Sequence, residues 1–212
     1  MSDVLSTNIQ YIKGVGPRLA KILSKKGIET YEDALYFLPR AYEDRRLIVP
    51  IKNLLSGTNA TVFGKISSSR LIRAGGRRNR FEATLTDETG SVILTWFNGY
   101  PSLVEEFAIG TQFLIYGEIR HFKNIPQIAH PEYEKITDLV NGKPTVSINF
   151  GRVVPVYSET EGLHQKTLRR MMGEVIRNSL PALHESLPEL MRERLHLPTL
   201  KKSFVPAMPV KY

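Results

Sequence analysis

The sequence has 212 residues, which suffices for one sizeable domain with an appendage or for two small domains and excludes a large multi-domain enzyme. Hydrophobic residues make up 42% of the chain and charged residues 24%, so we expect a folded core. The formal charge of +8 favours an anionic partner such as nucleic acid, and the absence of cysteine excludes disulfide scaffolds and thiolate zinc sites.

The sequence contains no targeting or membrane-spanning pattern. Its first ten residues lack the basic and then apolar arrangement of a secretory signal, and nowhere do about eighteen apolar residues follow one another. We therefore expect a cytoplasmic protein that does not bind membranes. We also expect a monomer.

Residues 1–46 have the patterning of helices. Apolar residues recur at helical spacing after Pro17, which suits a first helical turn because its missing N–H would be unpaired there anyway. Thr30, followed three residues later by Asp33, approximates a capping box and predicts the start of a second helix.

The turn at residues 12–17 has the form of a helix-hairpin-helix turn. In such turns glycines let the backbone N–H groups at a helix start approach a phosphate. Lys13, Gly14 and Gly16 are therefore candidate DNA contacts. A hairpin with a purely structural role explains these residues equally well.

Residues 47–150 change to the alternating period of strands. The expected strands lie at residues 61–66, 81–86, 91–97, 112–119 and 126–133, with a short helix near residues 103–107. Three strands, a helix and two strands is the order of an OB-fold barrel, a common platform for single-stranded nucleic acid. The predicted fold class is mixed and mainly β, with a five-stranded OB-fold barrel flanked by an N-terminal helical hairpin and a C-terminal helical segment.

Residues 151–212 return to helical patterning. An extended stretch at residues 153–157 precedes an amphipathic helix with apolar positions between Leu168 and Ile176, and a further helical patch lies near residues 187–197. We interpret this segment as a helical linker.

Signatures of catalysis are absent from the sequence. It contains no phosphate-binding loop, no nucleophile elbow and no zinc-protease motif, so we expect that this chain alone is not an enzyme. A metal-dependent hydrolase using His121, His130 and Glu132 is a competing hypothesis, although strand-end polar groups explain these residues better.

The sharpest electrostatic feature is a basic run between the first two expected strands. Six basic residues fall in sixteen positions that hold no acid: Lys65, Arg70, Arg73, Arg77, Arg78 and Arg80. A hairpin or loop must project here, and its Gly75-Gly76 pair could follow an irregular anion, so we expect its arginines to bind a phosphate backbone. A loop kept soluble by its charge is the alternative.

Large aromatic residues gather near the end of the third expected strand. Trp96 and Phe97 are neighbours, so their side chains point to opposite faces and only one can lie inside the barrel. Whichever ring faces outward, Tyr100 follows in the next loop. Exposed rings beside a basic loop suit base stacking, which makes Trp96, Phe97 and Tyr100 candidate DNA contacts.

Several stretches in order along the chain resemble the amino-terminal part of the RecG branched-DNA helicases. They are the turn at residues 12–17, LPRAYEDR at 38–45, GGRR at 75–78, DETG at 87–90, WFN at 96–98, HPE at 130–132, PVY at 155–157 and TEGLHQKTLR at 160–169. Two positions depart from the family pattern: Ala41 stands where arginine is frequent, and Trp96 where phenylalanine is usual.

The resemblance implies that residues 47–150 form a wedge that splits the arms of a replication fork, with aromatics at Trp96, Phe97 and Tyr100 stacking on unpaired bases. It also implies an ATP-driven motor that follows this region, so ATP and magnesium are expected only for that motor and no cofactor for this chain. Residues 151–212 would then lead toward the motor. Whether the chain is a fragment or a stand-alone relative is left open.

The leading functional hypothesis is structure-selective binding of branched DNA, including forks and Holliday junctions, in DNA repair and recombination. Single-stranded DNA is a further expected partner. The alternative is an OB-fold protein-interaction module that binds the single-stranded-DNA-binding protein or another peptide.

Overall fold

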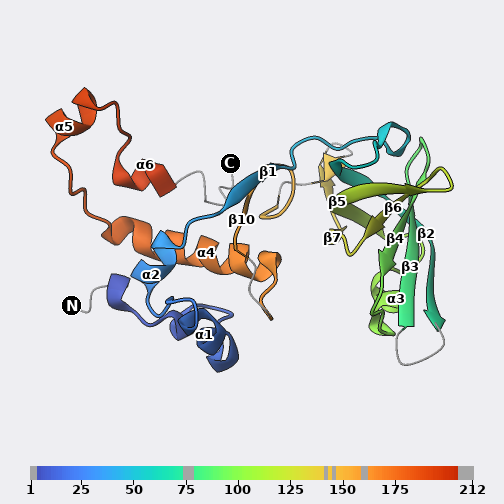
Figure 1. Ribbon diagram of the computed structural model, residues 1–212, viewed down its shortest axis with the longest axis horizontal. Coiled ribbons are helices and arrows are strands. Elements are labelled where there is room, and N and C mark those ends of the chain that lie inside the picture. Colours follow the sequence, from blue (N-terminus) through green and yellow to red (C-terminus); the bar gives the residue numbers. More distant parts are fainter. Residues whose placement is uncertain (1–3, 74–78, 141–142, 145–146, 159–161, 205–212) are drawn as a thin grey trace. The chain divides into compact units, whose positions relative to one another are not determined.

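The computed structural model describes residues 4–73, 79–140, 143–144, 147–158 and 162–204. They form two compact units (Figure 1). A helical unit combines Met1–Glu43 with Val154–Tyr212, and a barrel unit comprises Asp44–Val153. The segment after residue 150 that the sequence suggested as a linker thus contributes half of a compact unit. No helix among the described residues has both the length and the apolar character needed to cross a bilayer.

The helical unit is assembled from the two ends of the chain. Its elements are η1 (Val4–Ser6), η2 (Ile9–Tyr11), α1 (Pro17–Ser24), α2 (Tyr31–Tyr36), α4 (Gln165–Ser179), η4 (Leu180–Ala182), α5 (Glu189–Arg194) and α6 (Leu200–Phe204). The chain leaves this unit along β1 (Ala41–Asp44) and returns along β10 (Val153–Val156), and these strands pair in a two-stranded sheet.

Local signals and long-range packing both define the helical unit. Thr30 and Asp33 form the predicted capping box at the start of α2, each side chain accepting a hydrogen bond from the other's backbone N–H. The amphipathic face of α4, represented by Leu168, is buried in one cluster with Ile9 and Leu35 from the other end of the chain. Neither end buries its apolar face without the other.

The barrel unit contains a closed sheet. Its elements are η3 (Ile51–Asn53), β2 (Asn59–Arg73), β3 (Asn79–Thr86), β4 (Ser91–Trp96), α3 (Ser102–Glu106), β5 (Gln112–Phe122), β6 (Ile125–Ala129), β7 (Glu132–Ile136), β8 (Leu139–Val140) and β9 (Lys143–Pro144). The strand order β2-β3-β4-β6-β5 closes through pairing of β2 with β5, and only β4 and β6 are parallel among these pairs. The predicted mixed, mainly β class with an OB-fold barrel and flanking helices is confirmed.

The last predicted strand, residues 126–133, is two strands in the structure. His130 has a φ of +48°, which interrupts extended backbone, and Pro131 follows it. β6 pairs with the end of β5, and β7 pairs with the beginning of β5 on the same edge. The interruption turns the chain beside the end of β4, where His130 donates its backbone N–H to the carbonyl of Thr95 at 2.8 Å.

The first strand, β2, is longer than predicted and contains a bulge. The pairing of β2 with β3 shifts between Ile66 and Ser68, so Ser67 is an extra residue. Before the bulge, even-numbered residues such as Ile66 face the core. After it, odd-numbered residues such as Leu71 do so, and Arg70 faces outward.

A buried arginine ties the two connecting segments to the barrel. Arg45 is 1% exposed, and its guanidinium donates hydrogen bonds to both carboxylate oxygens of Glu132 at 2.8 and 3.0 Å. Its Cζ atom lies 3.8 Å from the centre of the Tyr116 ring, and Nη1 donates to the carbonyl of Asn149 at 3.3 Å. Arg45 precedes the strands of the closed sheet in the chain, and Asn149 follows them. One side chain therefore joins the segment that enters this sheet to the segment that leaves it.

Candidate nucleic-acid interface

The antiparallel neighbours β2 and β3 carry the described members of the basic run: Lys65, Arg70, Arg73 and Arg80. Arg70 stands opposite Glu82 in the strand register and donates two hydrogen bonds to its carboxylate, at 2.8 and 3.1 Å. Arg80 contacts the other oxygen of the same carboxylate. Glu82 therefore offsets one of these two positive charges, an effect hidden in the sequence because this acid follows the acid-free run.

The described arginines do not all face the same way. Strand alternation places Arg70 and Arg80 on the outer face of the sheet, whereas Arg73, opposite Asn79, belongs to the other face. Arg77 and Arg78 lie outside the described residues. The described part of the hairpin thus presents two arginines together and one apart from them.

Trp96 and Phe97 take opposite sides, with the tryptophan inward. The indole of Trp96 packs against the rings of Phe107 and Phe81, with centroid distances of 4.9 and 5.5 Å, and is partly buried against the barrel core. Phe97 is 53% exposed. The sequence allowed either Trp96 or Phe97 to point into the barrel. In the structure Trp96 points inward, and Phe97 is available to a ligand.

The loop that carries the exposed rings is attached to the start of β3. Tyr100, which is 51% exposed, and Phe97 belong to the loop that follows β4. In this loop the backbone N–H of Gly99 donates to the carbonyl of Asn79, the first residue of β3, at 2.8 Å. A Cβ atom on Gly99 would lie 2.6 Å from the Cβ atom of Phe81, so only glycine permits this close approach.

His130 is a neighbour of the exposed ring that the sequence did not identify. Its imidazole centre lies 5.3 Å from that of Phe97, and its Nε2 atom accepts the backbone N–H of Phe97 at 3.4 Å. The histidine therefore limits the movement of the loop and widens the exposed aromatic surface. No signal in the sequence indicated that His130 would lie beside Phe97. The turn that brings the two side chains together depends on the left-handed backbone of His130.

The structure does not assemble the competing metal site. Glu132 is engaged by Arg45, and His130 contacts Phe97. Across the described ranges, no three histidine or acidic side chains come close enough together to hold a metal ion. His121 lies on β5 opposite Pro126.

The glycine turn of the helical unit precedes α1. Gly14 has a φ of +90°, and Gly16 is the residue before the helix, with Pro17 in its first turn. A Cβ atom on Gly14 would lie 3.1 Å from the Arg170 guanidinium, so a cationic side chain of α4 lies against the turn. This placement is compatible with a phosphate contact at Lys13, Gly14 and Gly16, which stays a prediction.

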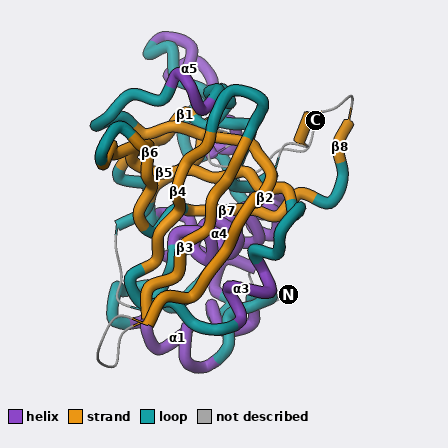
Figure 2. The backbone as a smooth tube through the Cα atoms, turned by 90° about the vertical axis from the view of Figure 1, so that its right-hand side faces the viewer, coloured by secondary structure: helices purple, strands orange, loops and turns teal. Residues whose placement is uncertain are grey.

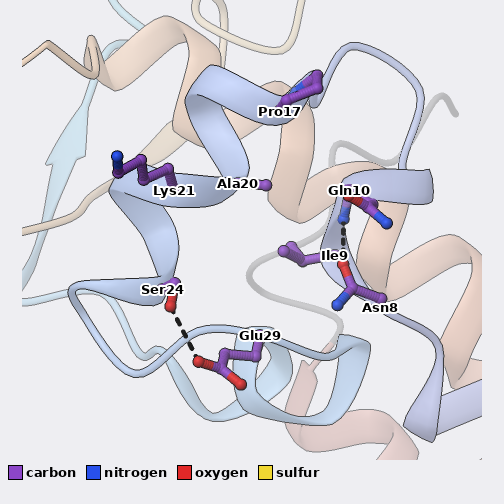
Figure 3. A pocket seen from close by; sticks show the side chains of 8 residues that line it. All are labelled: Asn8, Ile9, Gln10, Pro17, Ala20, Lys21, Ser24 and Glu29. Atoms are coloured by element: carbon purple, nitrogen blue, oxygen red, sulfur yellow. Dashed lines mark hydrogen bonds between the residues drawn. The ribbon is translucent and has the colours of Figure 1, made fainter.

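A pocket of about 350 Å³ lies beside this turn (Figure 3). The pocket is lined by residues at the start of η2, by one side of α1 and by a residue shortly before α2. They are Asn8, Ile9, Gln10, Pro17, Ala20, Lys21, Ser24 and Glu29. The Ser24 hydroxyl donates to the Glu29 carboxylate at 2.9 Å across its rim. The pocket carries both charge signs, which does not favour an anionic ligand.

Comparison with known proteins assigns the chain to a family. A family model described as the RecG wedge domain matches residues 8–179. The chain belongs to the RecG wedge family. A solved structure of RecG bound to a three-way DNA junction is similar to it, with a TM-score of 0.78 and 33% identity, and the match covers 96% of this chain and 27% of that one.

Related full-length RecG proteins are longer than this chain. The ATP-dependent DNA helicase RecG of Thermotoga maritima is 36% identical over 201 residues, which cover 94% of this chain and 25% of that protein. RecG of Escherichia coli K12 is 34% identical over 189 residues, covering 88% and 26%. The chain thus spans about a quarter of the length of these RecG relatives.

Proposed function

We propose that this chain is the wedge of a RecG-type helicase and binds branched DNA, such as replication forks and Holliday junctions, by structure rather than by sequence. The observation that carries the proposal is the attachment of the loop at residues 97–100 to the start of β3, beside the basic run, through the hydrogen bond between Gly99 and Asn79. Further support comes from the similar structure of RecG, which is bound to a three-way DNA junction.

The proposed interface divides two tasks. Arginines of the hairpin bind phosphates, which positions the DNA without reading its sequence. Phe97 and Tyr100 stack on unpaired bases at the branch point, and Trp96 supports their loop from the core side. Base identity matters little, because every base offers a flat face.

The energies fit a wedge that holds a branch open rather than one that melts a duplex. Stacking of one base on an aromatic side chain contributes about 1 to 3 kcal/mol, and one DNA base-pair step about 1.4 kcal/mol. Two exposed rings can therefore stabilise one or two opened pairs. Longer unwinding requires a motor, which we place in another part of a longer protein together with its ATP and magnesium.

Fluorescence anisotropy with a three-way junction and a plain duplex of equal length tests the proposal. The chain should bind the junction more tightly, and Phe97→Ala should reduce that preference by about fivefold or more, because it removes a stacking surface of at least about 1 kcal/mol. Equal affinities of the unmodified chain for the two DNAs would contradict the wedge and would favour a protein-interaction module.

A charge variant separates the two tasks. Replacing Arg77 and Arg78 by glutamine should weaken binding to both DNAs and lower the salt slope by about 0.7 to 0.9 for each lost phosphate contact. Arg177→Gln, on the exposed face of α4, serves as the matched control. If the Phe97→Ala and hairpin variants had the same effects on slope and preference, the division of tasks would be wrong.

A further inference from the structure

A second exposed aromatic side chain lies at the tip of the β5–β6 hairpin. Lys123 and Asn124 form a two-residue turn with φ values of +50° and +64°, as type I′ turns require. The turn sets Phe122 directly opposite Ile125, and these side chains are 62% and 46% exposed. A hairpin this tight fixes the position of the ring instead of leaving it on a long loop.

The register of the sheet places Phe122 and Phe97 on the same face. In β5, the buried core positions Phe113, Ile115 and Ile119 are odd-numbered, so Phe122 belongs to the outward set. In β4, Trp96 lies inward and Phe97 follows on the outward side. Both exposed rings therefore border one surface.

Strand β6 connects the two rings along that surface. It runs parallel to β4, with Gln127 beside Ile93 and Ala129 beside Thr95. Its first residue faces Phe122, and the residue after its end, His130, contacts the ring of Phe97. Figure 2 shows β2, β3, β4 and β6 side by side in this sheet.

The surface between the rings suits the bases of a nucleic acid. One row across five strands consists of uncharged side chains and one arginine: Ser68, Thr84, Ile93, Gln127 and Arg120. The acids on the outward side of these strands, Glu82 and Glu118, both pair with arginines. Along the described residues of these five strands, a phosphate backbone crossing the outer face therefore meets no carboxylate without a cation beside it.

The hairpin tip offers a cation next to its ring. The Nζ atom of Lys123 lies 5.7 Å from the centre of the Phe122 ring. A nucleotide could stack its base on Phe122 while its phosphate approaches Lys123. The same combination of a ring and nearby cations occurs at the Phe97 end, where Arg70 and Arg80 flank the sheet.

We propose that Phe122 is a second base-stacking site and that the outer face from Phe97 to Phe122 carries an unpaired single strand leaving the branch point. This inference rests on the proposed function, because Phe97 defines where the strand begins. The path along β6 from Ile125 to His130 is roughly 17 Å at about 3.3 Å per residue. It accommodates about five nucleotides stacked at about 3.4 Å, within the site sizes of OB folds.

The test uses the whole 212-residue chain and three-way junctions whose branch carries an unpaired arm of increasing length. Affinity should rise with arm length up to about five nucleotides. Phe122→Ala should abolish this rise, binding the long-arm junction about fivefold or more weakly, while binding the junction without an arm as before. Phe122→Tyr should retain the rise, because tyrosine keeps a stacking face.

A matched control removes an exposed apolar side chain elsewhere on the barrel unit. Ile109 is 72% exposed in the turn between α3 and β5, and Ile109→Ala should leave every affinity unchanged. A 2-aminopurine base placed in the arm should be quenched by the unmodified chain and not by Phe122→Ala. Lys123→Gln should lower the salt slope for the long-arm junction by about 0.7.

The outcomes distinguish this site from the wedge itself. If Phe122→Ala binds all arm lengths as the unmodified chain does, or loses affinity equally for all of them, the proposed path is overturned. If the unmodified chain shows no branch preference but keeps an arm-length dependence that Phe122→Ala removes, the wedge fails and the single-strand site stands.

Discussion

The two units of the chain reach their cores in different ways. The barrel unit buries one continuous stretch, Asp44–Val153, in which β2 pairs with β3, β3 with β4, and β5 with β6 as neighbours in sequence. The helical unit buries the faces of helices that lie more than a hundred residues apart, such as α2 and α4. This contrast predicts that the units unfold separately, with the single tryptophan, Trp96, reporting on the barrel and far-ultraviolet circular dichroism mainly on the helices.

The largest expected effect comes from Arg45→Ala. Removing this side chain leaves Glu132 without the arginine and empties the space over the Tyr116 ring, which should cost the barrel about 4 kcal/mol. Urea unfolding followed by Trp96 fluorescence should shift to lower denaturant, while the dichroism transition stays. Arg46→Ala is the control, because Arg46 is exposed and its replacement should lower the free energy of unfolding by less than about 1 kcal/mol. Equal shifts of both signals would show that the units unfold as one.

The converse variant is Leu168→Ala in the core of the helical unit. Leu168 is 1% exposed, and its truncation should destabilise this unit by about 3 kcal/mol through lost burial and a residual cavity. The dichroism transition should move, and the fluorescence of Trp96 should not. Lys166→Ala, a change on the same helix outside the buried cluster, provides the comparison. A shift in the fluorescence transition would contradict separate unfolding.

The smallest expected effect concerns the cap of α2. The hydrogen bond from the Thr30 hydroxyl, with those from the backbone N–H groups of Glu29 and Thr30, lowers the pKa of Asp33 below its ordinary value of 3.8. The ionised carboxylate therefore stabilises the helical unit above that pH, and this contribution is lost as the pH falls through the lowered pKa. Thr30→Ala should cost about 1 kcal/mol at neutral pH and reduce the acid sensitivity of the dichroism transition. An unchanged acid transition would exclude the cap as its source.

The sequence predicted the barrel because most of its strands alternate cleanly. Two departures were hidden from that pattern. The break between β6 and β7 depends on the left-handed backbone of His130, which an ordinary histidine in an apolar-polar alternation does not announce. The union of the first and third segments was not predictable either, because an amphipathic helix shows which face is buried and not which partner covers it.

The candidate site could be predicted in its composition and not in its orientation. The third predicted strand would place apolar residues inward whether its odd-numbered or its even-numbered side chains faced the core. Only the structure therefore shows that Trp96 points inward and Phe97 outward. The arginines were visible, but their pairing with Glu82 depends on cross-strand register. Phe122 gave no signal of its own, because a phenylalanine at the end of an apolar strand is usually read as part of the core.

The bulge at Ser67 determines which residues of the hairpin meet solvent on the outer face. Because strand residues alternate with a period of two, pairing the same residues without the bulge would exchange the two sides of β2 beyond Ser67. Leu71 would then turn toward water and Arg70 toward the apolar interior. Loss of the bulge would leave every arginine in the chain and yet undo the charge arrangement more completely than loss of any single one, so the position of the bulge matters as much as residue identity when sequences of this family are compared.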